Sequence, residues 1–231
     1  MSKNIVLVGA SRGIGSEIVH FLAKDKTNKI LAFSRNLEAM KTSFSSYSNV
    51  ICCAVDLSKK NLKSEFEKCF SATFDSIDIL INNAGKIVNK PFLELTPEEI
   101  QSCYQVNVLS VFETIQAALP FMQKKGGHVV AISSMGGFQG SVKFGGLSAY
   151  STSKAAVASL IELLAEEYKD TKIKFNCLAL GSAQTEMLEE AFPGYIAPLS
   201  AKKMAEFIAV FSLNSQQWIN GKIIPVSLTT P

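Results

Sequence analysis

The sequence predicts an α/β fold, in which a doubly wound parallel sheet forms the middle layer of a three-layer α/β/α sandwich. Two observations support this prediction: short apolar runs alternate with segments of helical periodicity, and a glycine-rich turn directly follows the first run. Alternating strands and helices build a parallel sheet covered on both faces, through right-handed crossovers. Because the 231 residues contain no repeat or linker, we expect residues 1–231 to form a single domain.

The individual elements follow from local patterns. Buried strands are short and apolar, whereas helices repeat apolar positions every three to four residues. By these criteria we expect strands at 4–8, 29–33, 50–55, 77–81, 128–132, 173–180 and 222–226. Helical periodicity predicts helices at 14–25, 58–70, 97–124, 150–169 and 200–213. Thr96 marks the start of the third helix, because Pro97 and two acidic residues follow it.

The glycine turn contains Gly9, Gly13 and Gly15 in the spacing G-x-x-x-G-x-G, between the first strand and the first helix. A tight turn at a helix N-terminus presents backbone N–H groups and a positive dipole end to a phosphate. The common dinucleotide fingerprint is G-x-G-x-x-G, so the match is to the mechanism and not to the pattern. The turn indicates a Rossmann-type dinucleotide site; an ordinary tight turn is the alternative.

Composition excludes several classes of protein. Hydrophobic residues make up 47% of the chain and charged residues 19%, as in a folded globule. The net charge of +3 comes without a basic run, so we expect no nucleic-acid partner and no membrane surface as partner. The first strand begins almost at once, and no apolar stretch reaches the ~18 residues of a membrane span. We therefore expect a soluble, cytoplasmic protein.

The cysteines give no sign of a metal site. They are odd in number and scattered, with no C-x-x-C spacing, and only His20 and His128 could join them. We therefore expect buried, reduced thiols and no bound metal. The five positions are Cys52, Cys53, Cys69, Cys103 and Cys177.

A Tyr-x-x-x-Lys step at Tyr150 and Lys154 indicates a site that can transfer a proton. In a helix, a spacing of four places the phenol and the ammonium group on one face. A nearby cation favours the phenolate and lowers the tyrosine pKa from its ordinary value of about 10. Such a tyrosine can exchange a proton near neutral pH. Taken alone, the pair could equally lie on an ordinary solvated helix.

Three further motifs occur in order along the chain: Asn82-Asn83-Ala84-Gly85, Asn107 and Ser133-Ser134. Together with the glycine turn and the Tyr-x-x-x-Lys step, they resemble those of the short-chain dehydrogenase/reductase family. The resemblance covers nearly the whole chain. It implies that the single domain both binds a dinucleotide and carries the catalytic residues.

By this resemblance, Tyr150 is the proton donor to a carbonyl oxygen, and Lys154 holds the nicotinamide ribose and lowers the Tyr150 pKa. Ser134 would hydrogen-bond the developing alkoxide, and Asn107 would fix a water that links Lys154 to solvent. Ser134 is chosen over Ser133 because the family's serine precedes x-x-Gly. Considered singly, Asn107 could be an ordinary helix residue and Ser134 a strand-end cap.

The expected cofactor is NADP(H). An acidic residue would end the second strand in an NAD enzyme, but Arg35 follows this strand and Arg12 lies in the glycine turn. Two guanidinium groups could clamp a 2′-phosphate; alternatively both are solvated and are neutralised by Glu38 or Asp25. The expected cofactor contacts are Gly9, Ser11, Arg12, Gly13, Ile14, Gly15, Ser34, Arg35, Asp56, Leu57, Asn83, Ala84, Gly85, Tyr150, Lys154, Gly181 and Thr185.

The chain departs from the family pattern at three places. The segment 136–146 lengthens the step from Ser134 to Tyr150 and carries five glycines. It could form a mobile substrate loop or a disordered surface loop. Leu180-Gly181 stands where the family has Pro-Gly. The C-terminal tail after residue 226 is short. Relatives often use a longer tail to build a tetramer, so we expect a homodimer through helices 97–124 and 150–169, with a tetramer possible.

The leading functional hypothesis is an NADP-dependent carbonyl reductase, which transfers hydride between NADP(H) and a small or medium apolar carbonyl or alcohol substrate. A sugar-nucleotide epimerase or dehydratase is a weaker alternative, because those relatives add a substrate lobe for which this chain has no room. A non-catalytic, dinucleotide-sensing regulatory protein is the non-enzymatic alternative. Loss of the Tyr, Lys or Ser would favour the sensor, but all three are present.

Overall fold

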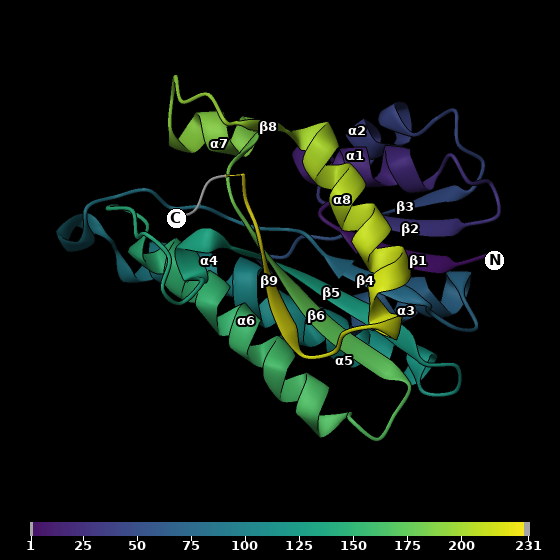
Figure 1. Ribbon diagram of the computed structural model, residues 1–231. Coiled ribbons are helices and arrows are strands. Elements are labelled where there is room, and N and C mark those ends of the chain that lie inside the picture. Colours follow the sequence, from purple (N-terminus) through teal and green to yellow (C-terminus); the bar gives the residue numbers. More distant parts are fainter. Residues whose placement is uncertain (1, 229–231) are drawn as a thin grey trace.

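A computed structural model describes residues 2–228, in which seven parallel strands form one twisted sheet (Figure 1). The strand order is β3-β2-β1-β4-β5-β6-β9, so the direction of winding reverses between β1 and β4. This confirms the doubly wound α/β fold. The strands are β1 (Asn4–Val8), β2 (Lys29–Ser34), β3 (Val50–Ala54), β4 (Ile79–Asn82), β5 (Gly127–Ser134), β6 (Ile173–Leu180) and β9 (Lys222–Val226).

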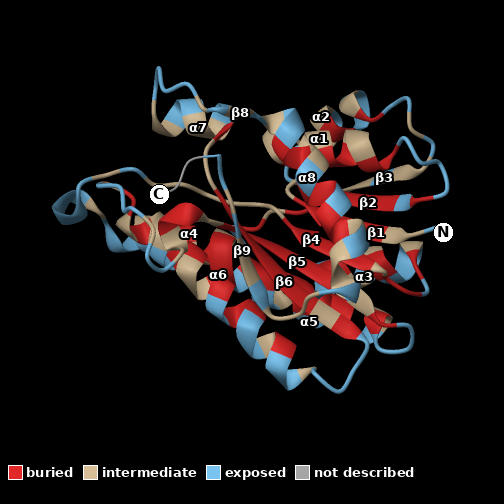
Figure 2. Ribbon diagram, in the orientation of Figure 1, coloured by how far each residue is buried: buried red, intermediate tan, exposed pale blue. Residues whose placement is uncertain are grey.

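Helices cover both faces of the sheet, so that buried strands lie between more exposed outer helix faces (Figure 2). One face carries α1 (Gly13–Leu22), α2 (Leu37–Ser43) and α8 (Ala201–Asn214). The other face carries α3 (Lys63–Thr73), α4 (Pro97–Tyr104), α5 (Ser110–Met122) and α6 (Ser148–Glu167). Short 3₁₀ turns are η1 (Phe92–Glu94), η3 (Met135–Gly137) and η4 (Ser215–Gln217).

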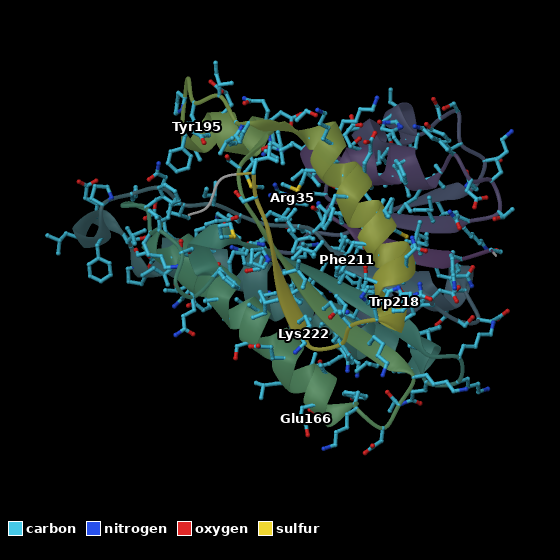
Figure 3. The ribbon with its side chains drawn as sticks, viewed as in Figure 1. Arg35, Glu166, Tyr195, Phe211, Trp218 and Lys222 are labelled. Carbon is cyan, nitrogen blue, oxygen red and sulfur yellow. The ribbon has the colours of Figure 1, made fainter. Side chains whose placement is uncertain are left out.

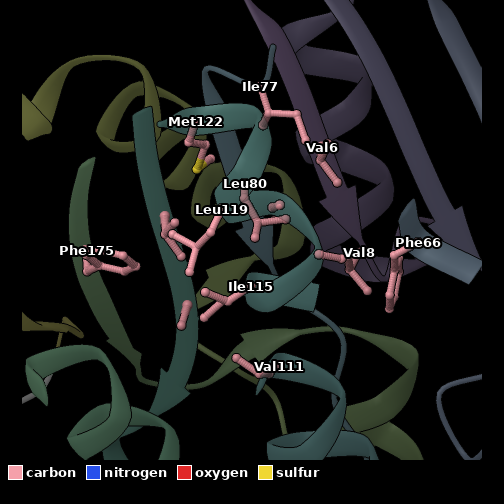
Figure 4. Packing of buried hydrophobic residues seen from close by; sticks show 14 of the residues in the cluster. Val6, Val8, Phe66, Ile77, Leu80, Val111, Ile115, Leu119, Met122 and Phe175 are labelled. Carbon is pink, nitrogen blue, oxygen red and sulfur yellow. The ribbon is translucent and has the colours of Figure 1, made fainter. Parts of the chain in front are cut away.

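Strand β1 shows why the sheet is apolar on both faces. Ile5 and Leu7 pack into the cluster under α1 and α8, whereas Val6 and Val8 pack into the cluster under α3 and α5. Successive side chains of a strand point to opposite faces, and here each face has a helical cover. Figure 4 shows the second cluster, in which Leu80, Ile115 and other side chains fill the space between strands and helices.

All seven predicted strands are found, and their bounds at 173–180 and 222–226 agree with the prediction. The predicted helix 97–124 begins as expected: the Thr96 hydroxyl accepts a hydrogen bond from the Glu99 N–H, and the Glu99 carboxylate accepts one from the Thr96 N–H. Its middle differs, because the π-helical turn η2 (Gln105–Leu109) separates α4 from α5. Helix α2 was not predicted, since seven residues are too few for a clear periodicity.

The segment after β6 contains short elements that the sequence analysis did not predict. It contains β7 (Ala183–Gln184) and α7 (Glu186–Ala191), and β7 pairs with β8 (Leu199–Ser200) just before α8 begins. This two-stranded pairing holds both ends of the α7 segment together beyond the main sheet (Figure 1). None of the helices in residues 2–228 combines the length and apolar character needed to cross a membrane.

All five cysteines are free thiols. Cys103 and Cys177 are buried, as predicted, but the other three are only half-buried. The Sγ atoms of Cys53 and Cys69 lie 2.7 Å apart, and burial is the main cause that raises the pKa of Cys69 to about 12. No group of three or more possible metal-ligating side chains occurs in the part of the chain that the structure describes.

Candidate active site

The predicted site residues follow strands that run parallel, so they gather at the carboxyl edge of the sheet. The glycine turn follows β1, Asn83 to Gly85 follow β4, and Ser134 ends β5. Strands β1 and β4 are neighbours at the point where the winding reverses. Ligands of open α/β sheets bind in the crevice at such a point.

The glycine turn and the loop after β4 approach so closely that side chains are excluded. Gly9 has φ +92°, and a Cβ placed there would lie 2.6 Å from the backbone of Ala84. A Cβ at Gly15 would lie 1.8 Å from the carbonyl oxygen of Gly9. The Asn83 Nδ2 donates to the same Gly9 carbonyl at 2.9 Å. These glycines are therefore required by packing, whatever the turn binds.

The start of α1 suits the phosphates of a dinucleotide. Its N-cap residue, Arg12, makes no side-chain cap hydrogen bond, and the first turn holds no acidic residue. The N-terminal N–H groups are thus not occupied by a capping side chain. A cavity of about 890 Å³ opens here between the glycine turn and α7, and its wall includes Ser11, Gly13 and Thr185. Backbone donors with a positive dipole end fit a pyrophosphate.

The ends of β2 and β3 hold the residues expected near the adenosine. Ser34 donates to the Ser11 hydroxyl at 2.7 Å, which ties β2 to the glycine turn. Arg35 follows β2 and is exposed (Figure 3). Asp56 accepts hydrogen bonds from the Ser58 N–H and hydroxyl, which lower its pKa, and the charge of Arg35 acts in the same direction. Leu57 is buried.

Arg12 has a partner that the sequence did not predict. Its guanidinium donates to both carboxylate oxygens of Glu190 in α7, at 2.5 and 3.0 Å. These bonds hold the pKa of Arg12 above and that of Glu190 below their ordinary values. The suggested neutralising residues lie elsewhere: Glu38 pairs with Lys41 at 3.0 Å, and Asp25 accepts bonds from Thr27.

Tyr150 and Lys154 lie on the first turns of α6, with the Lys154 Nζ 6.0 Å from the Tyr150 ring centre. The Nζ donates to the Ile132 carbonyl at 2.8 Å, and burial lowers the pKa of Lys154 to about 8. Burial raises the pKa of Tyr150, which a hydrogen bond with Ser134 partly opposes. The net pKa shift of Tyr150 is upward, because desolvation of the phenol is the largest of its causes.

The two adjacent serines at the end of β5 have different surroundings. Ser133 is buried, and its hydroxyl donates to the Lys154 carbonyl at 2.8 Å. Ser134 accepts a hydrogen bond from the Gly136 N–H at 3.2 Å and bonds with Tyr150. Alternation along the strand sends the two side chains to opposite sides, so only Ser134 shares a site with the phenol.

Asn107 occupies the π-helical turn η2 and is fully buried. Its Oδ1 accepts from the Lys86 N–H at 2.7 Å, and its Nδ2 donates to the Lys86 carbonyl at 2.9 Å and to the Ser153 hydroxyl at 2.8 Å. Ser153 in turn donates to the Tyr150 carbonyl at 2.6 Å. Asn107 is thus linked to Tyr150 through Ser153, which the sequence analysis overlooked although it lies inside the Tyr-x-x-x-Lys step.

Gly85 is the place where these groups meet. A Cβ at this position would lie 3.4 Å from the Lys154 Nζ and 3.7 Å from the Asn107 Oδ1. The structure therefore brings Asn107, Lys154 and the loop after β4 together, with Tyr150 and Ser134 alongside.

The remaining predicted residues border this region. Gly181 donates its N–H to the Val226 carbonyl at 2.9 Å, and a Cβ there would lie 2.6 Å from the Ser227 hydroxyl. Thr185 caps α7 through the Leu188 N–H, and a Cβ at Gly13 would lie 3.3 Å from its methyl group. Thr185 thus lies beside the glycine turn, while Gly181 is tied to the end of β9.

A doubly wound sheet with a glycine turn after β1, and with Ser134, Tyr150 and Lys154 grouped at the same edge, defines the class of dinucleotide-dependent oxidoreductases. The chain belongs to the short-chain dehydrogenase family, whose model, described as short chain dehydrogenase, matches residues 3–195. The family resemblance inferred from the motifs is thereby confirmed.

Individual relatives match over nearly their whole length. Carbonyl reductase family member 4 of Xenopus laevis is 31% identical, over 98% of this chain and 97% of its own. The 3-oxoacyl-acyl-carrier-protein reductase of Chlamydia trachomatis is 28% identical, over 98% and 96%. A short chain dehydrogenase structure from Salmonella enterica matches with a TM-score of 0.88 and 26% identity, over 97% and 96%. A short chain dehydrogenase structure from Burkholderia cenocepacia, in complex with NADP, matches with a TM-score of 0.86 and 25% identity, over 97% of this chain and 96% of its own.

Proposed function

We propose that the protein reduces a carbonyl group on a small or medium, largely apolar substrate, with NADPH as the cofactor. The observation that carries the proposal is the grouping of Ser134, Tyr150 and Lys154 beside Gly85, at the edge where the sheet reverses its winding. A proton donor, a hydrogen-bond donor and a buried cation are what the reduction of a carbonyl oxygen requires.

Each group has a distinct role in this proposal. Tyr150 donates a proton to the substrate oxygen, and Ser134 donates a hydrogen bond to the same oxygen as negative charge develops on it. Lys154 and the loop at Asn83, Ala84 and Gly85 would hold the nicotinamide ribose. NADPH supplies the hydride when bound. Asn107 positions this loop and, through Ser153, the first turn of α6.

The ionisation of the site suits reduction. Because burial raises the Tyr150 pKa, the phenol carries its proton at neutral pH and can give it away. The pKa of Lys154 is about 8, so most of the lysine is protonated at pH 7. A cation close to the phenol stabilises the phenolate that forms when the proton leaves.

Several residues support NADPH over NADH. The end of β2 carries Ser34 and Arg35 where an acidic residue would select NADH, and Arg12 lies in the glycine turn. Two guanidinium groups suit a 2′-phosphate. The Burkholderia relative was solved with NADP. The remaining expected contacts, among them Ile14, Asp56, Leu57 and Thr185, border the same edge of the sheet.

An apolar substrate is suggested by exposed side chains in two segments. Val142 and Phe144 are exposed in segment 136–146, and Tyr195 and Ile196 are exposed after α7. Two relatives are named as a carbonyl reductase family member and as a 3-oxoacyl-acyl-carrier-protein reductase, and both names describe enzymes that reduce a carbonyl group. We propose that these two segments border the substrate.

The first experiment is a titration of the purified protein with NADPH and NADH, followed by turnover with ketones, aldehydes and quinones. We expect tighter binding of NADPH and oxidation of NADPH with at least one carbonyl. Tyr150→Phe should keep NADPH binding and lose about 10²- to 10⁴-fold in kcat. Binding without any turnover would favour a dinucleotide sensor, and wild-type turnover in Tyr150→Phe would contradict the proton-donor role.

We further propose a homodimer, formed through the helices on one face. Leu109 and Phe112, at the junction of η2 and α5, and Leu163 in α6 are large apolar side chains that are 49%, 41% and 66% exposed. Equilibrium sedimentation should give a dimer at micromolar concentration, and Leu163→Glu should shift it toward monomer.

The tail on which the tetramer argument rests includes residues 229–231, which lie outside the described residues. A cytoplasmic location stays a prediction.

A further inference from the structure

The contact between Arg12 and Glu190 joins two segments that lie far apart in the sequence. Arg12 belongs to the glycine turn, and Glu190 lies in α7. The two N–H···O bonds measure 2.5 and 3.0 Å, and each guanidinium nitrogen meets a different carboxylate oxygen. This is the paired geometry in which arginine also binds phosphate.

The surroundings of this pair are acidic. The wall of the cavity at the start of α1 includes Glu17, Glu186, Glu189 and Glu190, and among residues 2–228 Arg12 is the one cationic side chain that lines it. Such a cavity attracts an anion poorly while Arg12 is engaged. The same cavity lies at the N-terminal end of α1, where the proposed function requires the phosphates of a dinucleotide.

We propose that Glu190 occupies Arg12 in place of a phosphate group of the dinucleotide, so that cofactor binding displaces Glu190 and releases α7 from the glycine turn. The inference rests on the proposed NADP(H) binding. It makes Glu190 a residue that sets cofactor affinity without touching the cofactor. The pairing between β7 and β8 would keep the released helix at the same end of the sheet.

The energetics allow such an exchange. The Arg12 and Glu190 side chains are 48% and 60% exposed, and exposed ion pairs are weak. A phosphate with a larger charge can therefore replace the carboxylate. Removing the competing charge should tighten cofactor binding only modestly, by about two- to five-fold in Kd.

The test compares Glu190→Gln with Glu189→Gln in fluorescence titrations with NADPH and NADH. Glu189 lines the same cavity and loses the same charge, but it accepts a hydrogen bond from the Gly194 N–H and not from Arg12. We expect Glu190→Gln to bind NADPH two- to five-fold more tightly and Glu189→Gln to bind as the wild type does. Tighter binding of NADPH alone would identify the 2′-phosphate as the group that competes with Glu190 for Arg12. Tighter binding of both nucleotides would identify the pyrophosphate as that group.

A double-mutant cycle separates competition from general repulsion. In an Arg12→Ala background, Glu190→Gln should give no further gain, because there is no guanidinium left to release. Equal gains in Glu189→Gln, a gain that persists without Arg12, or wild-type affinity in Glu190→Gln would each overturn the inference. Wild-type protein that binds neither nucleotide would overturn the proposed function itself, which is a different result.

Discussion

Asn107 binds both backbone groups of Lys86: its Oδ1 accepts from the N–H at 2.7 Å, and its Nδ2 donates to the carbonyl at 2.9 Å. The side chain thereby fixes the loop after β4 to the π-helical turn between α4 and α5. Asn107 is fully buried, so water does not compete for these bonds. Turns of this kind occur often at functional sites, and this one directs a polar side chain into the candidate site.

Asn107→Ala should destabilise the fold by about 2 to 4 kcal/mol, because the part-buried Lys86 N–H and carbonyl lose their hydrogen bonds to a fully buried side chain. Chemical denaturation measures this loss. Gln105→Ala is the matched control, since Gln105 lies in the same turn and its Nε2 makes a single hydrogen bond, to the Lys59 carbonyl at 2.8 Å. Equal losses in the two variants would contradict the special role of the bonds to Lys86.

The adjacent serines offer a second comparison. Ser134→Ala should lower kcat by about 10²- to 10³-fold with little change in stability, because it removes a donor to the developing charge. Ser133→Ala should do the opposite and destabilise by roughly 1 to 2 kcal/mol, since the buried Lys154 carbonyl loses its side-chain partner. Steady-state kinetics and chemical denaturation of both variants test these expectations. If Ser133→Ala lost activity and Ser134→Ala lost stability, the two roles would be exchanged.

Cofactor selectivity is tested at Arg35. Arg35→Ala should weaken NADPH binding by about 10- to 100-fold and leave NADH nearly unchanged, because a charge-assisted bond to the 2′-phosphate contributes roughly 1.5 to 3 kcal/mol. Lys41→Ala is the control, since it removes one positive charge from α2, where Lys41 pairs with Glu38. Equal losses for NADPH and NADH in Arg35→Ala would dismiss the contact with the 2′-phosphate.

His128 makes stability depend on pH. It is fully buried; its Nδ1 donates to the Ser212 carbonyl at 2.9 Å, so its Nε2 accepts from the Asn176 amide at 3.0 Å. Burial lowers the pKa of His128 from 6.5 to about 4. Below pH 6.5 the unfolded chain binds a proton that the folded protein does not, so stability is full above 6.5 and falls as the pH drops toward 4.

This difference amounts to roughly 3 kcal/mol at pH 4. Denaturation midpoints measured between pH 7 and pH 4 should fall steeply for the wild type and less for His128→Gln, which cannot titrate. Parallel pH profiles for the two proteins would show that His128 is not the group responsible.

The sequence alone determined the fold, because local patterns of apolar residues predict each strand of the main sheet and most of the helices. The apolar run at 173–180 predicts β6 residue for residue, and the capping residues Thr96 and Pro97 predict the start of α4. Tyr150 and Lys154 were also identified locally, since a helical spacing of four needs no knowledge of distant segments. The family match over residues 3–195 confirms the resemblance on which their proposed roles rest.

Only the tertiary structure decided what surrounds these residues. Arg12 and Glu190 are 178 positions apart, and no local pattern relates them. The π-helical turn η2, in which Asn107 is fully buried, interrupts the continuous helix that periodicity predicted at 97–124. The direction of the Tyr150 pKa shift depends on burial, which outweighs the opposing hydrogen bond with Ser134. Short-range patterns fix helices and strands, whereas desolvation and ion pairing depend on which distant segments meet.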